Sequence, residues 1–260
     1  MHSGQPPHIT RRNFITAMSG IGAAGFQRSS SNFTVTEVSN YRAILFDAFP
    51  IFDPRPVFQL VTEMFPENGM ELTKVWKTKQ FEYSWLRTAG ERYKNFWDVT
   101  RDALVNASKV AGISLSSKDE DRIMSAYLSL NVWPDVRPAL DELRKQGLRL
   151  GFLSNMTTEM LTSGIKYSKT EHFFEKVLST DLVKTYKPDP KAYQIGVDVL
   201  KLKKEEILFV SFAGWDAAGA KWFGYPTYWV NRLESVPEEL SVVPNGSGKS
   251  MVDLISFLKF

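Results

Sequence analysis

Cysteine is absent from this chain of 260 residues, and histidine occurs only as His2, His8 and His172. The lack of cysteine excludes disulfides, thiolate nucleophiles and Cys-ligated metal sites. No run of eighteen apolar residues occurs in the sequence, so an ordinary membrane-spanning helix is not indicated. Carboxylate, hydroxyl and amine side chains are therefore the main candidates for any chemistry.

Outside the first thirty residues, the chain has no excess of positive or negative charge. The formal net charge is +3, and Arg11, Arg12 and Arg28 supply it without an acid among the first thirty residues. The remaining 29 basic residues balance the 29 acidic residues. This balance offers no electrostatic argument for nucleic acid as a partner. A hydrophobic content of 43% is enough for a packed core, as one large domain or a domain plus an insertion.

The first 35 residues predict a leader segment rather than part of the fold. Thr10–Ile15 contains a twin-arginine pattern, and the mildly apolar stretch Ile15–Phe26 follows it. We expect export to the periplasm. One alternative is a basic tail or a misplaced start codon, and the protein would then be cytoplasmic. Another alternative is that the segment remains attached as an uncleaved anchor. Gly20–Gly25 has the spacing of a dinucleotide-binding loop, but no helix-forming sequence follows it, so a nucleotide site is rejected.

Asp47 directly follows the short apolar run Ala43–Phe46. A run of β-forming residues that ends in turn chemistry predicts a buried strand with a carboxylate at its carboxyl end. Ligands bind at this edge in open α/β sheets. Asp47 is therefore a candidate nucleophile or metal ligand.

Hydrophobic periodicity divides the rest of the chain into two kinds of segment. Helical spacing dominates residues 55–130, near 57–64, 72–87, 93–111 and 118–129. Strands are expected near 148–153, 176–178, 207–210 and 227–230, alternating with helices near 135–146, 158–165, 191–200, 217–223 and 251–258. This alternation predicts an α/β fold with a doubly wound, Rossmann-like parallel sheet. The core would comprise residues 41–54 and 131–260, and residues 55–130 would be an inserted α-helical cap.

Polar clusters follow three further predicted strands. They are Ser154–Asn155, Tyr186–Asp189 and Ser211–Asp216. Each cluster alone is weak, because turns are rich in such residues. Together with Asp47 they bring acids, an amide and a lysine to one sheet edge, which predicts a site. Gly248–Ser250 resembles the end of a phosphate-binding loop, but Val243 replaces the first glycine of that motif, so a polar surface loop is expected there.

These motifs resemble the haloacid dehalogenase superfamily and, more narrowly, the L-2-haloacid dehalogenases. The similarity extends from about Tyr41 to Phe260. It is carried by Ile44–Phe49, Gln80–Arg87, Leu153–Asn155, Tyr186–Asp189 and Ser211–Ala220.

The resemblance implies a mechanism in which a carboxylate displaces halide. Asp47 would attack the halogen-bearing carbon and form an ester, and water activated by Asp216 would hydrolyse that ester. Lys187 would favour the ionised form of Asp47. The alternatives are a surface lysine in a turn for Lys187 and a helix N-cap before Ala217 for Asp216.

The resemblance also implies binding roles around these groups. Ser154 and the backbone of Ala48 and Phe49 would bind the substrate carboxylate, and Asn155 and Lys77 would receive the halide. Tyr193 and Ser211 would be supporting polar residues. Three apolar residues would surround the reacting carbon, namely Phe81, Phe96 and Trp215. Tyr193 and Ser211 could equally satisfy buried backbone groups, and aromatic residues at helical spacing are usually core.

Two residues favour plain structural roles. Asp53 is expected to cap the first helix of the cap. His172, next to two phenylalanines, is expected to be a packed or surface histidine.

Four positions bear on the choice among functions. Phe49 stands where superfamily phosphatases carry a second acid that ligates Mg²⁺, so we expect neither metal nor organic cofactor. Three positions depart from the L-2-haloacid dehalogenase pattern. Lys77 replaces an arginine, and Ala213 replaces an asparagine. The family's Gly-Thr after the nucleophile is replaced by Pro50 and the residue that follows it, and this chain is one residue shorter there.

The leading prediction is hydrolytic dehalogenation of short L-2-haloalkanoic acids, with the haloacid and water as partners. A catalytically degenerate protein that binds a small carboxylate is the second candidate, and a Mg²⁺-dependent phosphatase is the third. A homodimer is expected only by analogy with the family.

Overall fold

The computed structural model describes residues 40–259, which belong to one compact unit, Val38–Phe260. The predicted twin-arginine leader, residues 1–35, lies outside the described residues. None of the helices in the described part of the chain has the length and apolar character needed to cross a membrane.

A parallel sheet forms the centre of the described unit, as the sequence predicts. Its strands are β1 (Ala43–Phe46), β2 (Arg149–Ser154), β3 (Lys176–Ser179), β4 (Ile207–Ser211), β5 (Thr227–Val230) and β6 (Gly246–Gly248). The strand order is β3-β2-β1-β4-β5-β6, and every pair is parallel. β1 is central and pairs with both β2 and β4. Two separately wound halves therefore meet at β1 and β4.

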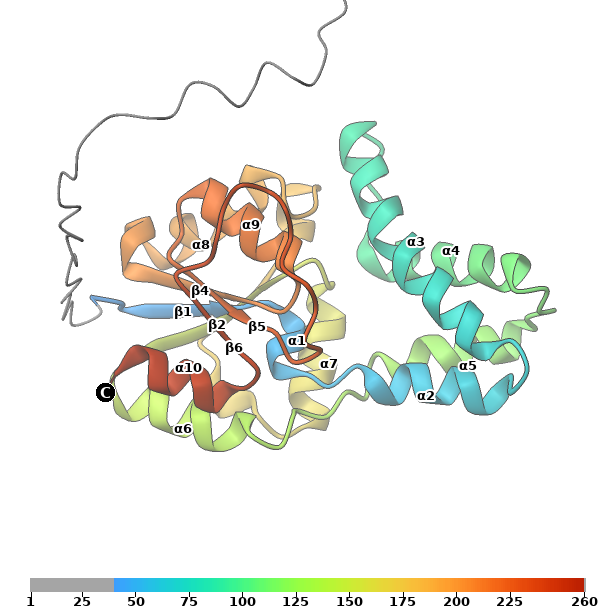
Figure 1. Cartoon of the computed structure of the whole chain (residues 1–260), viewed down its shortest axis with the longest axis horizontal. Helices are drawn as coiled ribbons and strands as arrows, with labels where there is room; N and C mark the ends of the chain where they lie inside the picture. Colours follow the sequence, from blue (N-terminus) through green and yellow to red (C-terminus); the bar gives the residue numbers. More distant parts are fainter. Residues whose placement is uncertain (1–39, 260) are drawn as a thin grey trace, which may run out of the picture. The chain divides into compact units, whose positions relative to one another are not determined.

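Side chains of β1 alternate between the two faces of the sheet. Ile44 and Phe46 join a buried cluster with α6 (Val136–Lys145), α7 (Thr158–Tyr167) and α10 (Met251–Leu258). Ala43 and Leu45 join a second cluster with α8 (Pro190–Leu200) and α9 (Gly214–Phe223). Figure 1 shows α8 and α9 on one side of the sheet and α6 and α10 on the other. The predicted doubly wound architecture is confirmed.

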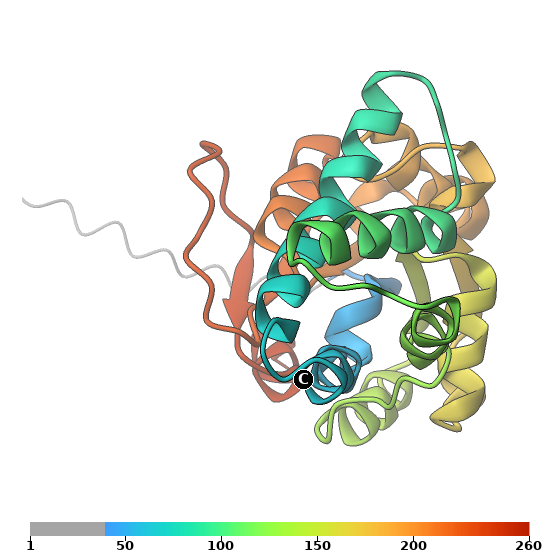
Figure 2. The same cartoon turned by 90° about the vertical axis from the view of Figure 1, so that its right-hand side faces the viewer.

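Four further helices make up the cap, which lies between β1 and β2 in the chain. They are α2 (Arg55–Met64), α3 (Gly69–Ala89), α4 (Phe96–Val110) and α5 (Ser117–Ala126). Trp76 Nε1 donates to the carbonyl of Thr100 at 2.8 Å, and Gln80 Nε2 donates to the hydroxyl of Thr100 at 2.7 Å, which ties α3 to α4. The cap lies on the side toward which the arrow of β1 points (Figures 1 and 2).

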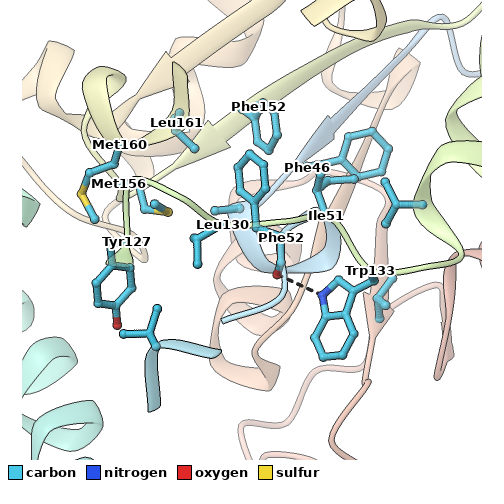
Figure 3. Packing of buried hydrophobic residues seen from close by; sticks show 14 of the residues in the cluster. Phe46, Ile51, Phe52, Tyr127, Leu130, Trp133, Phe152, Met156, Met160 and Leu161 are labelled. Atoms are coloured by element: carbon cyan, nitrogen blue, oxygen red, sulfur yellow. Dashed lines mark hydrogen bonds between the residues drawn. The ribbon is translucent and has the colours of Figure 1, made fainter. Parts of the chain in front are cut away.

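Trp133 ties together the two segments that connect the cap to the core. Phe52 and Val132 form an antiparallel bridge. Trp133 Nε1 donates to the carbonyl of Phe52 at 2.9 Å (Figure 3) and to that of Phe49 at 2.9 Å. The same indole ring contacts two cations, because the guanidinium of Arg55 lies 4.3 Å and that of Arg232 4.6 Å from its centre. These contacts hold the junction next to the carboxyl end of β1.

The segment after Asp47, where the sequence indicates turn chemistry, forms a short helix, α1 (Ala48–Ile51). Pro50 lies in the first turn, where a backbone N–H has no acceptor within the helix, so the proline removes no intrahelical hydrogen bond. Its carbonyl accepts a hydrogen bond from Arg232 Nη2 at 2.8 Å. The sequence departure at Pro50 is therefore compatible with an ordered site.

The sequence analysis also did not predict several other short elements. Gly248 ends the edge strand β6 rather than lying in a loop, and Ser250 caps α10. A Cβ at Gly248 would lie 2.4 Å from the hydroxyl of Tyr228, so close packing requires glycine there. Three 3₁₀ helices, η1 (Glu171–Phe173), η2 (Thr180–Val183) and η3 (Lys204–Glu206), are too short to have a recognisable period.

The structural roles expected for Asp53 and His172 have different outcomes. Asp53 accepts a hydrogen bond from the backbone N–H of Arg55 at 3.0 Å, but Pro54, not Asp53, occupies the N-cap position of α2. His172 is exposed in η1, as expected.

Candidate active site

Asp47 lies where the strand order of the sheet reverses. Its backbone N–H donates to the carbonyl of Val210 at 2.9 Å, which links the end of β1 to the end of β4. In open α/β sheets the loops after these two strands diverge to opposite faces and leave a crevice for a ligand. Asp47 begins α1 at this crevice, and its side chain retains 14% of its exposure. The predicted position of Asp47 at a strand end is confirmed.

Lys187 joins two carboxylates that come from different strand ends. Its ammonium donates to Asp47 Oδ1 at 2.9 Å and to Asp216 Oδ2 at 2.6 Å, and its side chain is only 1% exposed. Burial opposes the charge of this lysine, but the negative charges of Asp216 and Asp47 outweigh burial and raise the pKa of Lys187 above its ordinary value. Lys187 is therefore a buried cation held between two acids, not a surface lysine in a turn.

Asp216 lies in the first turn of α9, within the helix, because Ala213 occupies the N-cap position. The hydroxyl of Tyr193 donates to Asp216 Oδ1 at 2.7 Å. Burial raises the pKa of Asp216 to about 6, although the charge of Lys187 opposes this shift. Burial and the charge of Asp216 also raise the pKa of Tyr193 well above its ordinary value, so Tyr193 stays a neutral donor. Asp216 can therefore exchange a proton near neutral pH.

Ser154 and Asn155 form the wall of the site beside β2. The hydroxyl of Ser154 donates to Asp47 Oδ1 at 3.0 Å. Asn155 Oδ1 accepts from the backbone N–H of Lys187 at 3.0 Å, which fixes the amide and leaves its Nδ2 without a partner among the described residues. The buried hydroxyl of Ser211, at the end of β4, likewise has no partner there. Buried polar atoms usually have partners, so Asn155 Nδ2 is available to a ligand, whereas Ser211 lines none of the cavities described below.

A small chamber of about 30 Å³ opens in front of these groups, which is room for about one water molecule. We call it the Asp47 chamber. Phe81 of α3 packs on Trp215 of α9 with ring centres 5.4 Å apart, so the cap and the core share one aromatic wall. The residues that line the Asp47 chamber are Asp47, Phe49, Phe81, Phe96, Ser154, Asn155, Met156, Lys187, Phe212, Ala213, Trp215 and Asp216.

Lys77 does not line the Asp47 chamber. It lines a second cavity of about 310 Å³, and its ammonium lies over the ring of Phe58, 4.8 Å from the ring centre. The halide-binding position implied for Lys77 is thus separated from Asp47 in this structure. Ala48, the other implied binding residue outside the lining, lies next to Asp47 as the first residue of α1 and is fully buried.

Sequence analysis missed some residues that shape the site. A Cβ at Gly219 would lie 2.6 Å from the hydroxyl of Tyr193 and 2.6 Å from Pro188 Cβ, so glycine is required for Tyr193 to reach Asp216. A glycine inside an alanine-rich helix is the available signal for such a close approach. Phe212 gives no comparable signal, because a single aromatic residue after a strand is common.

Known proteins resemble this chain in sequence and in fold. The family described as haloacid dehalogenase-like hydrolase matches residues 30–224. An (S)-2-haloacid dehalogenase of Pseudomonas sp. (strain YL) is 37% identical over 205 residues, which cover 78% of this chain and 88% of that protein. This chain belongs to the L-2-haloacid dehalogenase family.

Solved structures of L-2-haloacid dehalogenases superpose on the described fold. One shares 39% identity at a TM-score of 0.82 and covers 85% of this chain and 99% of its own. Another, from Xanthobacter autotrophicus with chloropropionic acid covalently bound, shares 30% identity at a TM-score of 0.78 and covers 84% of this chain and 98% of its own. The predicted family and fold are confirmed.

Proposed function

We propose that this protein hydrolyses the carbon–halogen bond of L-2-haloalkanoic acids and releases halide and a 2-hydroxy acid. One observation carries the proposal: a carboxylate, Asp47, shares a buried ammonium with a second carboxylate, Asp216, at 2.9 and 2.6 Å. The names of the relatives and the covalent complex of the Xanthobacter autotrophicus enzyme support the same chemistry. The protein is then a hydrolase acting on carbon–halide bonds.

The first step uses the free oxygen of Asp47. Oδ1 accepts hydrogen bonds from Ser154 and Lys187, whereas Oδ2 accepts none from the described residues. Oδ2 attacks C2 of the substrate from the side opposite the halogen, a carbon–oxygen bond forms, and the carbon–halogen bond breaks with its electrons leaving on the halide. The product is an ester between Asp47 and the inverted C2 carbon.

The second step needs a base and a site for negative charge. Asp216 takes a proton from water, which attacks the ester carbon of Asp47. Since the ester forms through Oδ2, the charge of the tetrahedral intermediate develops on Oδ1. Ser154 and Lys187 already donate to this atom at 3.0 and 2.9 Å, so they act as a preorganised oxyanion hole. The bond from the ester carbon to Oδ2 then breaks, and the leaving oxygen takes the proton from Asp216, which releases the 2-hydroxy acid. The re-formed carboxyl group of Asp47 loses its proton to solvent.

Isotope labelling tests this route directly. Purified protein is incubated with L-2-chloropropionate in ¹⁸O water through many turnovers, and the peptide that contains Asp47 is then analysed by mass spectrometry. We expect ¹⁸O in the Asp47 carboxylate and chloride in solution. Absence of chloride, or equal chloride release by Asp47→Asn, would contradict the proposed function, while chloride release without label would contradict the ester route.

A protein that only binds a small carboxylate is the second candidate. The placement of Lys77 outside the Asp47 chamber favours it, as does Ala213, which gives α9 no side-chain cap. Thermal stabilisation by lactate without any turnover of haloacids would support this candidate. The phosphatase candidate is disfavoured by Phe49, whose ring packs on Phe212 with centres 5.8 Å apart where a metal-ligating acid would be needed.

We further propose that residues 1–35 direct export through the twin-arginine pathway. The pair Arg11 and Arg12 before an apolar stretch supports this proposal. Replacing both arginines with lysine should move the protein from the periplasmic to the cytoplasmic fraction of a bacterial host. Equal periplasmic amounts of variant and native protein would contradict it.

A homodimer is proposed by analogy with the family. Trp85 and Leu86 of α3 are 40% and 60% exposed and are available for a contact between copies. Sedimentation of the native protein and of Leu86→Lys distinguishes a dimer from a monomer.

A further inference from the structure

The cavity of about 310 Å³ adjoins the Asp47 chamber, and we call it the side cavity. The two share Phe49, Phe81, Phe212 and Ala213 in their linings, so they are neighbours across a common wall. The Asp47 chamber itself has room for about one water molecule. A group attached to the reacting carbon can therefore extend into the side cavity.

Carbon atoms dominate the wall of the side cavity. The cap supplies Phe58 and Tyr127, the linker supplies Pro54 and Trp133, and Phe212 comes from the segment after β4. A space with this lining favours an apolar ligand over a polar one, because a polar group would lose water without gaining a partner.

Some of the polar groups at this wall have partners. The ammonium of Lys77 lies over the ring of Phe58 at 4.8 Å. The guanidinium of Arg55 pairs with Asp53 at 2.7 Å. Trp133 Nε1 donates to two backbone carbonyls at 2.9 Å. A ligand in the side cavity therefore meets mainly hydrocarbon, which suits an alkyl or aryl substituent.

Ala213 stands where the two spaces meet. It lines both of them, and only a methyl group occupies this position at the start of α9. A longer side chain here would project into the common wall. The small residue thus leaves a passage from the reacting carbon toward the side cavity.

We propose that the side cavity is a subsite for an apolar substituent on C2 of the substrate. The preferred substrates are then 2-haloalkanoic acids with a butyl-sized or larger alkyl group, or an aryl group, in place of the methyl of 2-halopropionates. This inference rests on the proposed function and assigns the substrate class of the same site. Each methylene that enters the cavity favours the transition state by about fourfold, given the usual free energy of burying a CH₂ group.

Halide release from two acids tests the proposal. We expect kcat/KM for 2-bromohexanoate to exceed that for 2-bromopropionate by about tenfold or more. A lower value for 2-bromohexanoate, with 2-bromopropionate still turned over, would overturn the subsite. Bromide from neither acid would instead overturn the proposed function.

Binding of unhalogenated acids separates the subsite from turnover. Hexanoate should raise the melting temperature of the native protein more than propionate does at equal concentration, because only its chain reaches the side cavity. Equal shifts would overturn the proposal even if dehalogenation proceeds.

Variants of the loop before β6 provide a matched pair. Leu233 is 58% exposed and lines the side cavity but not the Asp47 chamber, whereas Leu240 is 38% exposed and lines neither. Leu233→Trp should lower the ratio of kcat/KM for 2-bromohexanoate over 2-bromopropionate by about fivefold or more, since the larger ring fills the space. Leu240→Trp should leave this ratio as in the native protein. Equal ratios in all three proteins would overturn the subsite.

Discussion

The core and cap sides of the site differ in what they contribute. The core supplies Asp47, Lys187, Asp216 and Tyr193, which are joined by hydrogen bonds of 2.6–2.9 Å in a buried chain. The cap supplies mostly aromatic rings, together with Arg55, Gln80 and Lys77, and the ammonium of Lys77 lies over a ring rather than beside an acid. In the proposed function the core therefore holds the reacting groups, and the cap shapes the space above them.

This difference has a physical cause. A buried charge is tolerated only with a partner, so Lys187 cannot be replaced without leaving Asp47 and Asp216 uncompensated. Apolar packing tolerates exchanges of similar volume at low cost. We expect large effects from core substitutions and small effects from cap substitutions, and the predictions below test this ranking.

Asp216→Asn should give the largest effect on turnover, a loss of about a thousandfold or more, because the ester of Asp47 lacks its base. One halide per protein molecule should still be released, followed by arrest. Quenched-flow halide measurement and the mass of the Asp47 peptide would show this burst. Asp198→Asn, at an exposed position on α8, is the control. Steady release by Asp216→Asn would show that the base lies elsewhere.

Lys187→Met should lower the free energy of unfolding by about 3–5 kcal/mol, because Asp47 and Asp216 lose the ammonium between them. Urea denaturation of the variant and of Lys191→Met, which changes an exposed lysine of α8, measures the difference. An unchanged midpoint for Lys187→Met would contradict a buried charge network. Activity should be lost as well, since the oxyanion hole loses one of its two donors.

The pH dependence should follow Asp216, whose pKa is raised to about 6 mainly by burial. Hydrolysis of the Asp47 ester should slow about tenfold per unit as the pH falls below this value, since the protonated base cannot act. Stability should change in the opposite direction. Between about pH 4 and 6 the folded state binds more protons than the unfolded state, so the contribution of Asp216 to the free energy of unfolding decreases as the pH rises.

Ester decay followed by mass spectrometry, and urea denaturation at pH 4 to 8, measure the two effects. A pH-independent decay rate between pH 5 and 8 would rule out this role of Asp216. Asp216→Asn should abolish this part of the pH dependence of stability.

Lys77→Met should give the smallest effect, a loss of kcat/KM for 2-bromopropionate of less than about tenfold. The ammonium lies over Phe58 in the side cavity and not in the Asp47 chamber. A loss near that of Asp216→Asn would show that the lysine reaches the halide during catalysis, and the contrast between cap and core would fail. Lys74→Met, at an exposed position on the same helix, is the control.

Much of the fold could be predicted because long elements repeat a pattern. β1, β2, β4 and the helices around them have clear apolar periods, and acids or amides follow several strands. β6 and α1 could not be found in this way, since three or four residues are too few to show a period. The required absence of a side chain at Gly219 depends on Tyr193, which belongs to another helix.

The sequence by itself indicated the parallel sheet, because apolar runs ending in Asp47, Ser154 and Ser211 encode buried strands with polar ends. Its motifs indicated the family and, through that resemblance, the candidate reacting groups. Tertiary structure alone decided how those groups pair, which oxygen of Asp47 stays free, and where the cap lysine points. Distances of a few ångströms control charge interactions and cavities. Residues separated by many positions in the chain set these distances, so no local pattern records them.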